Sequence, residues 1–396
     1  MPRATRPNPL FESQPYADLP DEVLQTVLGR TAEVAEQVRG LFTRVDERKE
    51  AMRDALLGAG RVRRLADLPP CPQPPPVAAV DGGAAIEKAL GADTALAVAV
   101  GIEGITDEPL SFWPAVQYAA WQSTLPHEGD ATAATCRGIM TALELSVLRN
   151  APHPVVLLDG SHLTPVIALN AMLGVANDAL REEIAAAVRR HDTADALRDV
   201  MTAPQCVAVV KYDSSRDLSH TWLPDEMRGP GLGLDDRTTM SLLLEAGEFT
   251  DPQPIALTQE SKQNWLTKRI DVLTPADEAR EAVRVALNDA VSVVREDRLL
   301  ATYFKPHPWA PAFRLEIKPE VARTPDALAA VLAGIRAQVV SPEIREPYPQ
   351  WVADRMAKSV GDALVALRTA VNFDLADAGL AEYVSLVAHS YRTEAL

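Results

Sequence analysis

The stretch Pro74–Gly83, with the sequence PPPVAAVDGG, decides the fold. Its three prolines end any preceding helix, because proline fixes φ and cannot continue the helical hydrogen bonding. The apolar run Val77–Val80 then predicts a short buried strand that ends on Asp81, and the two glycines after it allow a sharp turn or a close approach to a ligand. The same order recurs at Val155–Asp159, which is followed by Gly160. Two buried strands that each bring an aspartate and a glycine to one end of a sheet predict a divalent-metal site.

The bulk composition is that of a globular protein with a substantial core. The chain has 396 residues, of which 47% are hydrophobic and 24% are charged. Its formal net charge of −16 argues against a broad, sequence-independent coat on DNA, because such binding depends on Lys and Arg side chains that neutralise phosphates. The charge does not exclude a nucleic-acid enzyme, since carboxylates loaded with metal ions form a locally positive site.

The cysteines and the N-terminus indicate the compartment. Cys71, Cys136 and Cys206 are scattered and form no CxxC motif, so neither a disulfide framework nor a zinc site is predicted. The N-terminal sequence has no apolar segment of the signal-peptide kind, and no apolar run approaches the roughly 18 residues that span a membrane. We therefore expect a soluble, cytoplasmic protein.

Three parts are predicted along the chain. Residues 1–73 form an N-terminal arm with amphipathic helices, residues 74–372 form the main domain, and residues 373–396 form a C-terminal helical tail. Within the first part, residues 1–18 are expected to be a loose arm. Apolar residues recur at helical spacing among many charges over Asp21–Gly58, which predicts one or two helices that pack on the core or against a second copy.

Strands and helices interleave in the main domain, which predicts an α/β or mixed α+β class. Further strands are predicted at residues 94–100, 205–211, 301–304 and 312–317, with an edge segment at 107–127. Helices are predicted at residues 129–150, 165–200 and 348–371, and others begin at Thr324 and at the capping box Thr274–Asp277. The glycine-rich segment 228–233 lacks the spacing of a nucleotide-binding loop.

Three more charged residues are candidates for the site. Glu144 is the polar exception on the apolar side of the helix at 129–150, Lys211 ends the strand at 205–211, and Asp354 follows the start of a late helix. Each candidate has a structural alternative. An aspartate after a strand often stabilises a turn, a helical glutamate is often solvated, a lysine at a strand end extends its ammonium to water, and an acid in the first helical turn favours the helix dipole.

Three or four carboxylates on separate elements suit Mg²⁺ or Mn²⁺, which prefer oxygen ligands. Two such ions about 4 Å apart would activate a water and stabilise the leaving oxygen of a phosphodiester. Lys211 is the candidate contact for a substrate phosphate. No GxSxG motif is present around Ser161, and no cysteine has a nearby histidine, so a serine or cysteine nucleophile is not predicted.

Taken together, these motifs resemble the NurA nucleases over residues 75–372. The resemblance is carried by the Val-Asp-Gly-Gly strand, the Leu-Leu-Asp-Gly-Ser strand after a helical glutamate, the Val-Val-Lys strand and the late Pro-Tyr-Pro…Ala-Asp-Arg helix. It implies a ribonuclease H-like mixed sheet flanked by helices. It also implies a Mn²⁺- or Mg²⁺-dependent 5′-to-3′ exonuclease with single-strand endonuclease activity. The implied partners are a second copy and HerA, a hexameric ATPase, in DNA end resection for double-strand-break repair.

By position, Asp81, Glu144 and Asp159 are similar to the three acids of that family's metal site. Asp354 stands where many relatives carry a histidine, and Gly83 stands where a serine is common. The expected metal ligands are therefore Asp81, Glu144, Asp159 and Asp354, around two ions. Two other functions remain open from the sequence. One is a non-catalytic interaction subunit of a DNA-translocase complex, and the other is a metal-dependent phosphohydrolase of small substrates.

Overall fold

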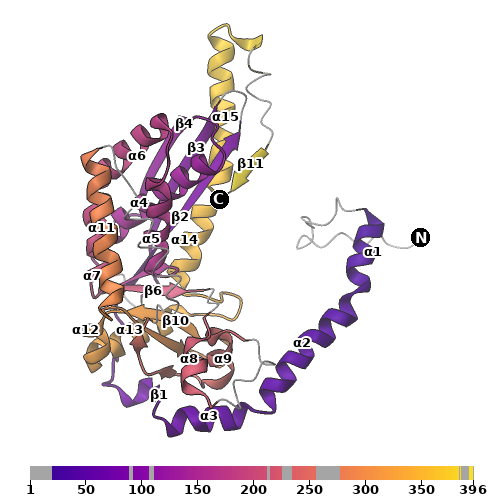
Figure 1. Cartoon of the computed structure of the whole chain (residues 1–396), viewed down its shortest axis with the longest axis vertical. Coiled ribbons are helices and arrows are strands. Elements are labelled where there is room, and N and C mark those ends of the chain that lie inside the picture. The colour runs from indigo at the N-terminus through magenta and orange to yellow at the C-terminus, as the bar shows by residue number, and fades with distance from the viewer. Residues whose placement is uncertain are drawn as a thin grey trace.

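A large mixed β-sheet runs through the molecule, with helices on both faces (Figure 1). The computed structural model describes residues 20–88, 92–106, 111–211, 215–224, 234–255, 277–382, 384 and 392–395. Over these residues the sheet has eleven strands. Their order is β1-β7-β9-β10-β6-β5-β2-β3-β4, with β8 paired to β9 and β11 paired to β2. The α/β class predicted from the alternating pattern is confirmed, and so is the mixed sheet flanked by helices that the resemblance implies.

The bounds of the strands are as follows: β1 Val62–Arg64, β2 Val77–Lys88, β3 Asp93–Glu103, β4 Gln117–Leu125, β5 Val155–Asp159, β6 Cys206–Val210, β7 Glu248–Thr250, β8 Gln253–Pro254, β9 Leu300–Lys305, β10 Phe313–Ile317 and β11 Arg392–Ala395. The helices are α1 Asp21–Gly29, α2 Thr31–Asp46, α3 Lys49–Gly58, α4 Asp130–Arg149, α5 Leu163–Leu173, α6 Asp178–Arg190, α7 Thr193–Thr202, α8 Asp217–Trp222, α9 Asp236–Leu243, α11 Glu278–Arg295, α12 Pro319–Arg323, α13 Pro325–Gln338, α14 Tyr348–Lys358 and α15 Val360–Asp377.

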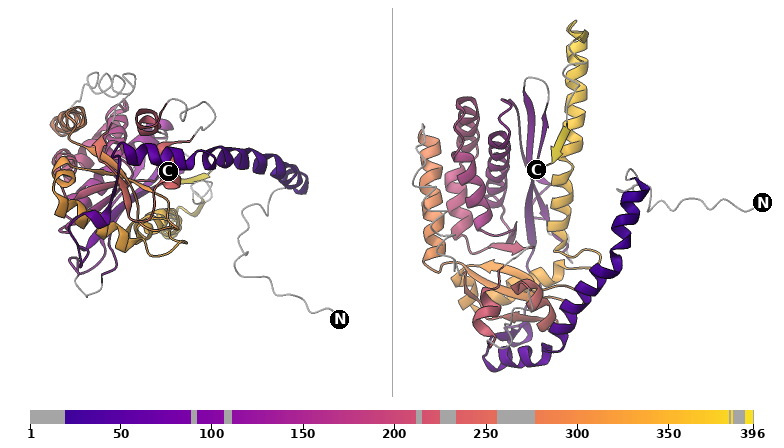
Figure 2. Two further views of the ribbon diagram at one scale, coloured as in Figure 1. Left: turned by 90° about the horizontal axis from the view of Figure 1, so that it is seen from below. Right: turned by 45° about the vertical axis from the view of Figure 1, so that its right-hand side comes forward.

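Two apolar layers cover the two faces of the sheet. On one face, side chains of β2, β3 and β5 pack against α4, α5, α6, α7 and α11. The right-hand view of Figure 2 shows these helices together on one side of the sheet. On the other face, alternate residues of β2, β5 and β6 pack against α12 and α13, while α14 and α15 cover β2 and β3. Strand β5 is parallel to β2 and β6, and the other strand pairs are antiparallel. The central strands are therefore buried on both sides, which explains their continuous apolar runs.

Strand β2 is longer than the sequence predicts. The short strand expected at Val77–Val80 continues to Lys88, so Asp81 lies within it and the two glycines make no turn. Those glycines serve close packing instead. A Cβ atom on Gly82 would lie 2.4 Å from the Glu144 carboxylate of α4, and one on Gly83 would lie 2.1 Å from the Ala357 carbonyl oxygen of α14. Helices thus approach both faces of β2 at neighbouring residues.

Most other elements match the prediction, with changes at helix breaks. The helix at 129–150 is α4, and the edge segment at 107–127 contains β4, which ends the sheet. The helical stretch at 165–200 is divided into α5, α6 and α7, because Asn177 caps a new helix and Asp192 has a left-handed φ of 45°. The late helix breaks at Ser359 into α14 and α15.

The C-terminal part is not wholly helical. Helix α15 extends to Asp377, but Arg392–Ala395 is a strand that pairs antiparallel with Ala85–Lys88 of β2. The expectation of a helical tail over residues 373–396 is wrong for this strand. The extended β2 provides the free edge on which β11 pairs.

Over Asp21–Gly58 the structure has three α-helices, one more than the upper number predicted. Helix α3 is anchored to the body by Met52 and Leu56, which are buried beside Trp222 and Met240. Helices α1 and α2 project from it (Figure 1), and α1 has no buried residue.

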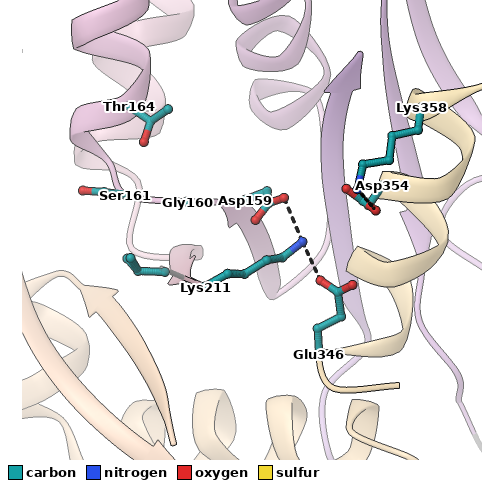
Figure 3. Close-up of a pocket in the computed structure, with 9 residues that line it drawn as sticks. Asp159, Gly160, Ser161, Thr164, Lys211, Glu346, Asp354 and Lys358 are labelled. Atoms are coloured by element: carbon teal, nitrogen blue, oxygen red, sulfur yellow. Dashed lines mark hydrogen bonds and ion pairs between the residues drawn. The ribbon is translucent and has the colours of Figure 1, made fainter. Parts of the chain in front are cut away.

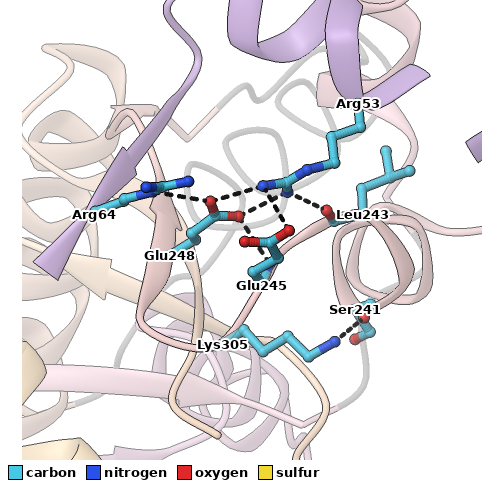
Figure 4. Close-up of polar contacts among 7 residues, drawn as sticks. All are labelled: Arg53, Arg64, Ser241, Leu243, Glu245, Glu248 and Lys305. Carbon is cyan, nitrogen blue, oxygen red and sulfur yellow. Dashed lines mark hydrogen bonds and ion pairs between the residues drawn. The ribbon is translucent and has the colours of Figure 1, made fainter. Parts of the chain in front are cut away.

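A buried ion pair adds to this anchor (Figure 4). The Arg53 guanidinium donates to both oxygens of Glu248, at 2.7 and 2.8 Å. Glu248 is only 1% exposed and also contacts Arg64 Nε at 3.4 Å. Burial alone would raise the pKa of Glu248, but the hydrogen bonds from Arg53 and from the Glu245 backbone lower it below its usual range.

Some predicted features lie outside the described residues. These are the loose arm at 1–18, the glycine-rich segment 228–233 and the Thr274 end of the capping box. At the other end of that box, Asp277 is itself the N-cap of α11, where its side chain accepts from Arg280 N. Among the helices that the structure describes, none is long and apolar enough to cross a bilayer.

Candidate metal centre

Three carboxylates from distant parts of the chain meet at one end of β5. Ligand oxygens of Asp81, Asp159 and Asp354 all lie within 4.8 Å of one another. Asp81 and Asp159 are neighbours because β2 and β5 are parallel, with Val80 opposite Leu158, so the next residue of each strand is the aspartate. The sequence thus predicted two members from strand ends, and the sheet register explains why they converge.

Asp354 reaches the cluster from the face of the sheet that α14 covers. Side chains alternate along a strand, so Asp81 and Gly83 face α14, while Gly82 faces α4. The close approach of α14 at Gly83 brings Asp354 to Asp81. Asp354 lies in the second turn, and α14 has no acid in its first turn, so the helix-dipole alternative does not explain it. Its Oδ2 accepts from Lys358 Nζ at 2.8 Å.

Glu144 lies beside the cluster rather than in it. It comes from α4, on the opposite face of β2, with its Oε1 against Gly82. It is not among the three acids whose ligand atoms converge. Its side chain is only partly exposed and lies against Gly82 of β2, so it is not a freely solvated helix residue. Burial, together with the charges of Asp81 and Asp159, raises its pKa well above the usual carboxyl range.

Asp159 is held by two donors that the sequence did not connect to it, and Figure 3 shows one of them, Lys211. Its Oδ1 accepts from Gln350 Nε2 at 2.8 Å, and its Oδ2 accepts from Lys211 Nζ at 2.9 Å. Lys211 Nζ also lies 2.5 Å from Glu346 Oε2. Lys211 is therefore paired with carboxylates and does not extend freely into water.

Glu346 and Gln350 are the site residues that sequence reasoning missed. Both flank the Pro347-Tyr348-Pro349 segment that begins α14. The available signal was helical spacing, because Gln350 is four residues before Asp354 and so shares its helix face. Glu346 precedes the helix, and no pattern in the sequence relates it to Lys211.

The pKa values of Asp81 and Lys211 are shifted by burial and by the negative charges of the neighbouring carboxylates. Burial, followed by the charge of Asp159, raises the pKa of Asp81 to about 8. Burial alone would lower the pKa of the Lys211 ammonium, but Asp159 and Glu346 more than offset this and raise it above its usual value. Carboxylates this close repel one another, and a bound cation relieves that repulsion.

The loop after Asp159 is fixed by a fully buried carboxylate on β10. Gly160 has a φ of 86°, which turns the chain sharply after β5. Glu316 then accepts from Ser161 Oγ at 3.0 Å and from His162 N at 2.9 Å. Burial opposes ionisation of Glu316, but hydrogen bonds from His162 and the charge of Arg314 lower its pKa to about 2. Asp159 is therefore positioned both by the donors to its own carboxylate and by the fixed loop that follows it.

A cavity of about 460 Å³ opens beside the acids. Its lining includes Asp159, Thr164, Lys211, Glu346, Asp354 and Lys358. Acidic oxygens and two ammonium groups thus share one opening. The all-oxygen donor set fits a hard divalent cation such as Mg²⁺ or Mn²⁺, and the lysines suit an anionic substrate.

Comparison with solved structures identifies the fold. The structure is similar to that of the NurA nuclease from Sulfolobus solfataricus, with a TM-score of 0.54 and 13% sequence identity. The match covers 91% of this chain and 98% of that chain. A second NurA crystal structure, determined with manganese, has a TM-score of 0.43 and 10% identity over 83% of this chain and 98% of that chain. No protein-family model matches the chain, and no curated protein has a significantly similar sequence. The shared fold therefore agrees with the resemblance seen in the motifs.

Proposed function

We propose that this protein is a metal-dependent DNA nuclease of the NurA type. The observation that carries the proposal is the convergence of Asp81, Asp159 and Asp354 within 4.8 Å. It is supported by the fold shared with a NurA nuclease. A scaffold has no need of three carboxylates that repel one another beside a cavity, whereas a divalent-metal site needs such a cluster of oxygen ligands.

The residues take distinct roles in this proposal. Asp81, Asp159 and Asp354 hold the divalent ions, Mn²⁺ or Mg²⁺ and two in number by the family resemblance, and Glu144 completes the acidic set from the α4 side. When bound, such an ion activates water and neutralises charge on the phosphate. Gln350 orients Asp159 through the hydrogen bond to Oδ1. Lys211 and Lys358 line the cavity and would attract the DNA backbone.

The finer features follow the family resemblance. We infer a ribonuclease H-like core, 5′-to-3′ exonuclease and single-strand endonuclease activities, and a role in end resection with a HerA-type ATPase. The net charge of −16 supports delivery of DNA by a partner, because the chain as a whole repels phosphate.

A homodimer is also part of the proposal. Apolar side chains are exposed along the projecting helices α1 and α2, including Val27 at 62%, Val34 at 50% and Val38 at 48%. Exposed apolar side chains along two successive helices mark a surface for another protein. A second copy or the ATPase ring would cover it.

The test is a cleavage assay on end-labelled linear DNA with added Mn²⁺, with and without a HerA-type ATPase and ATP. Asp81→Ala should abolish cleavage while the protein stays folded, because it removes the central ligand. Glu343→Gln is the matched control, since Glu343 is an exposed acid that accepts from Ser341 and lies outside the cluster. An Asp81→Ala protein that still cuts would refute the nuclease site. Absence of Mn²⁺ binding by the wild-type chain would favour the non-catalytic subunit.

A further inference from the structure

A lysine ammonium lies between two carboxylates at one side of the acidic cluster. Lys211 Nζ is 2.9 Å from Asp159 Oδ2 and 2.5 Å from Glu346 Oε2 (Figure 3). Asp159 in turn belongs to the cluster with Asp81 and Asp354. The Lys211 ammonium thus lies between the Asp159 and Glu346 carboxylates. A cation that bridged these two carboxylates would occupy the same position.

The chain builds this arrangement from three separate elements. Lys211 directly follows β6, which is parallel to β5 with Asp159 opposite Val209, so the lysine and the aspartate lie side by side. Glu346 comes from the segment before α14, where Pro347 follows it immediately. The Lys211 and Glu346 side chains are only 22% and 16% exposed, so this is not one of the weak pairs of the open surface.

We propose that the Lys211 ammonium occupies a cation position between Asp159 and Glu346, in place of a further divalent ion, and that Glu346 is the positioning residue that keeps it there. This inference rests on the proposed metal-dependent function. It gives the site a permanent positive charge next to the position of the metal, and this charge is present before any ion binds.

The metal count tests the proposal directly. In Lys211→Met, Asp159 and Glu346 lose their shared cation and can bind an ion in its place, so the variant should bind one more Mn²⁺ per chain than the wild type. In the double variant Lys211→Met with Glu346→Gln, the second carboxylate is absent and the additional ion should be lost again. The count of bound Mn²⁺ is obtained by titration at room temperature, with free Mn²⁺ measured by electron paramagnetic resonance.

A matched control separates this position from a general effect of charge. Lys358→Met removes the same charge from the lining of the same cavity, but Lys358 pairs with Asp354 and its side chain is 75% exposed. It should change Mn²⁺ affinity without adding an ion. Lys211→Gln repeats the test with a polar neutral side chain, in case the methionine variant does not fold.

The outcomes are distinct. An unchanged Mn²⁺ count in both Lys211 variants would overturn the inference, as would an equal gain in Lys358→Met or an additional ion that persists in the double variant. If one of these contrary results is found but the wild type binds Mn²⁺ and cuts DNA, only this inference fails. If the wild type binds no Mn²⁺, the proposed nuclease function fails with it.

Discussion

Replacement of Gly83 by alanine should separate α14 from the sheet and disrupt the acidic cluster. The new Cβ would lie 2.1 Å from the Ala357 carbonyl oxygen, where ordinary contact begins at 3.4 Å, so the helix must withdraw by about 1.3 Å. The obstacle is backbone, which cannot rotate away as a side chain can. Overpacking of this kind costs about 1–3 kcal/mol of unfolding free energy.

The same withdrawal should weaken metal binding, because Asp354 and Gln350 lie on α14. A shift of about 1 Å in a catalytic group lowers activity by about a hundredfold. Urea denaturation with and without Mn²⁺ would measure the losses of stability and of metal binding, and cleavage of end-labelled DNA would measure the loss of activity. Gly82→Ala is the nearest comparison for stability, since its Cβ would meet the movable side chains of Glu144 and Met140 and not backbone, so it should cost less. Gly361→Ala is the open control, with no atom within 4 Å, and should stabilise the protein by up to about 1 kcal/mol. A Gly83→Ala protein as stable as the wild type, with unchanged Mn²⁺ affinity, would refute the reasoning.

Three further predictions concern charge. Because the pKa of Asp81 is raised to about 8, its ionisation opposes folding, and the metal-free protein should lose up to about 1.4 kcal/mol of stability per pH unit as pH rises from about 4 to 8. Asp81→Asn should remove the contribution of Asp81 to this dependence of stability on pH, measured by urea denaturation with EDTA. An unchanged pH dependence in the variant would contradict the prediction. Arg53→Met should lower the free energy of unfolding by about 3 kcal/mol, because buried Glu248 then loses its two shortest ionic contacts. Arg64→Met removes only a 3.4 Å contact and should lower it less in the same denaturation assay. The pKa of Glu248 is lowered, so the Arg53 contribution should be lost as pH falls below the usual carboxyl range. The isolated protein should bind duplex DNA weakly and resect it poorly, given its net charge of −16, and efficient resection with no gain from a HerA-type ATPase and ATP would count against this.

The sequence alone determined the class of fold and much of the site. Continuous apolar runs identified the central strands, since strands buried on both faces have no polar side to alternate. The Asp-Gly pair after Val155–Leu158 marked the end of β5 correctly, because an apolar run that stops at an acid and a glycine is a local signal. Asp81 and Asp159 were named from such local patterns, whereas Asp354 was named from its place in the late helix that carries the family resemblance.

Only the tertiary structure decided how those residues are used. Gly82 and Gly83 favour a turn by local preference, but helices packed on both faces keep β2 extended through them. Lys211 meets Glu346 because β6 and the segment before α14 lie together in space, a contact that no local period encodes. Glu144 stays beside the cluster because α4 covers the other face of the sheet. Side-chain partners depend on the packing of distant elements, whereas strands and helix starts depend on neighbouring residues, and this difference separates what the sequence predicted from what the fold decided.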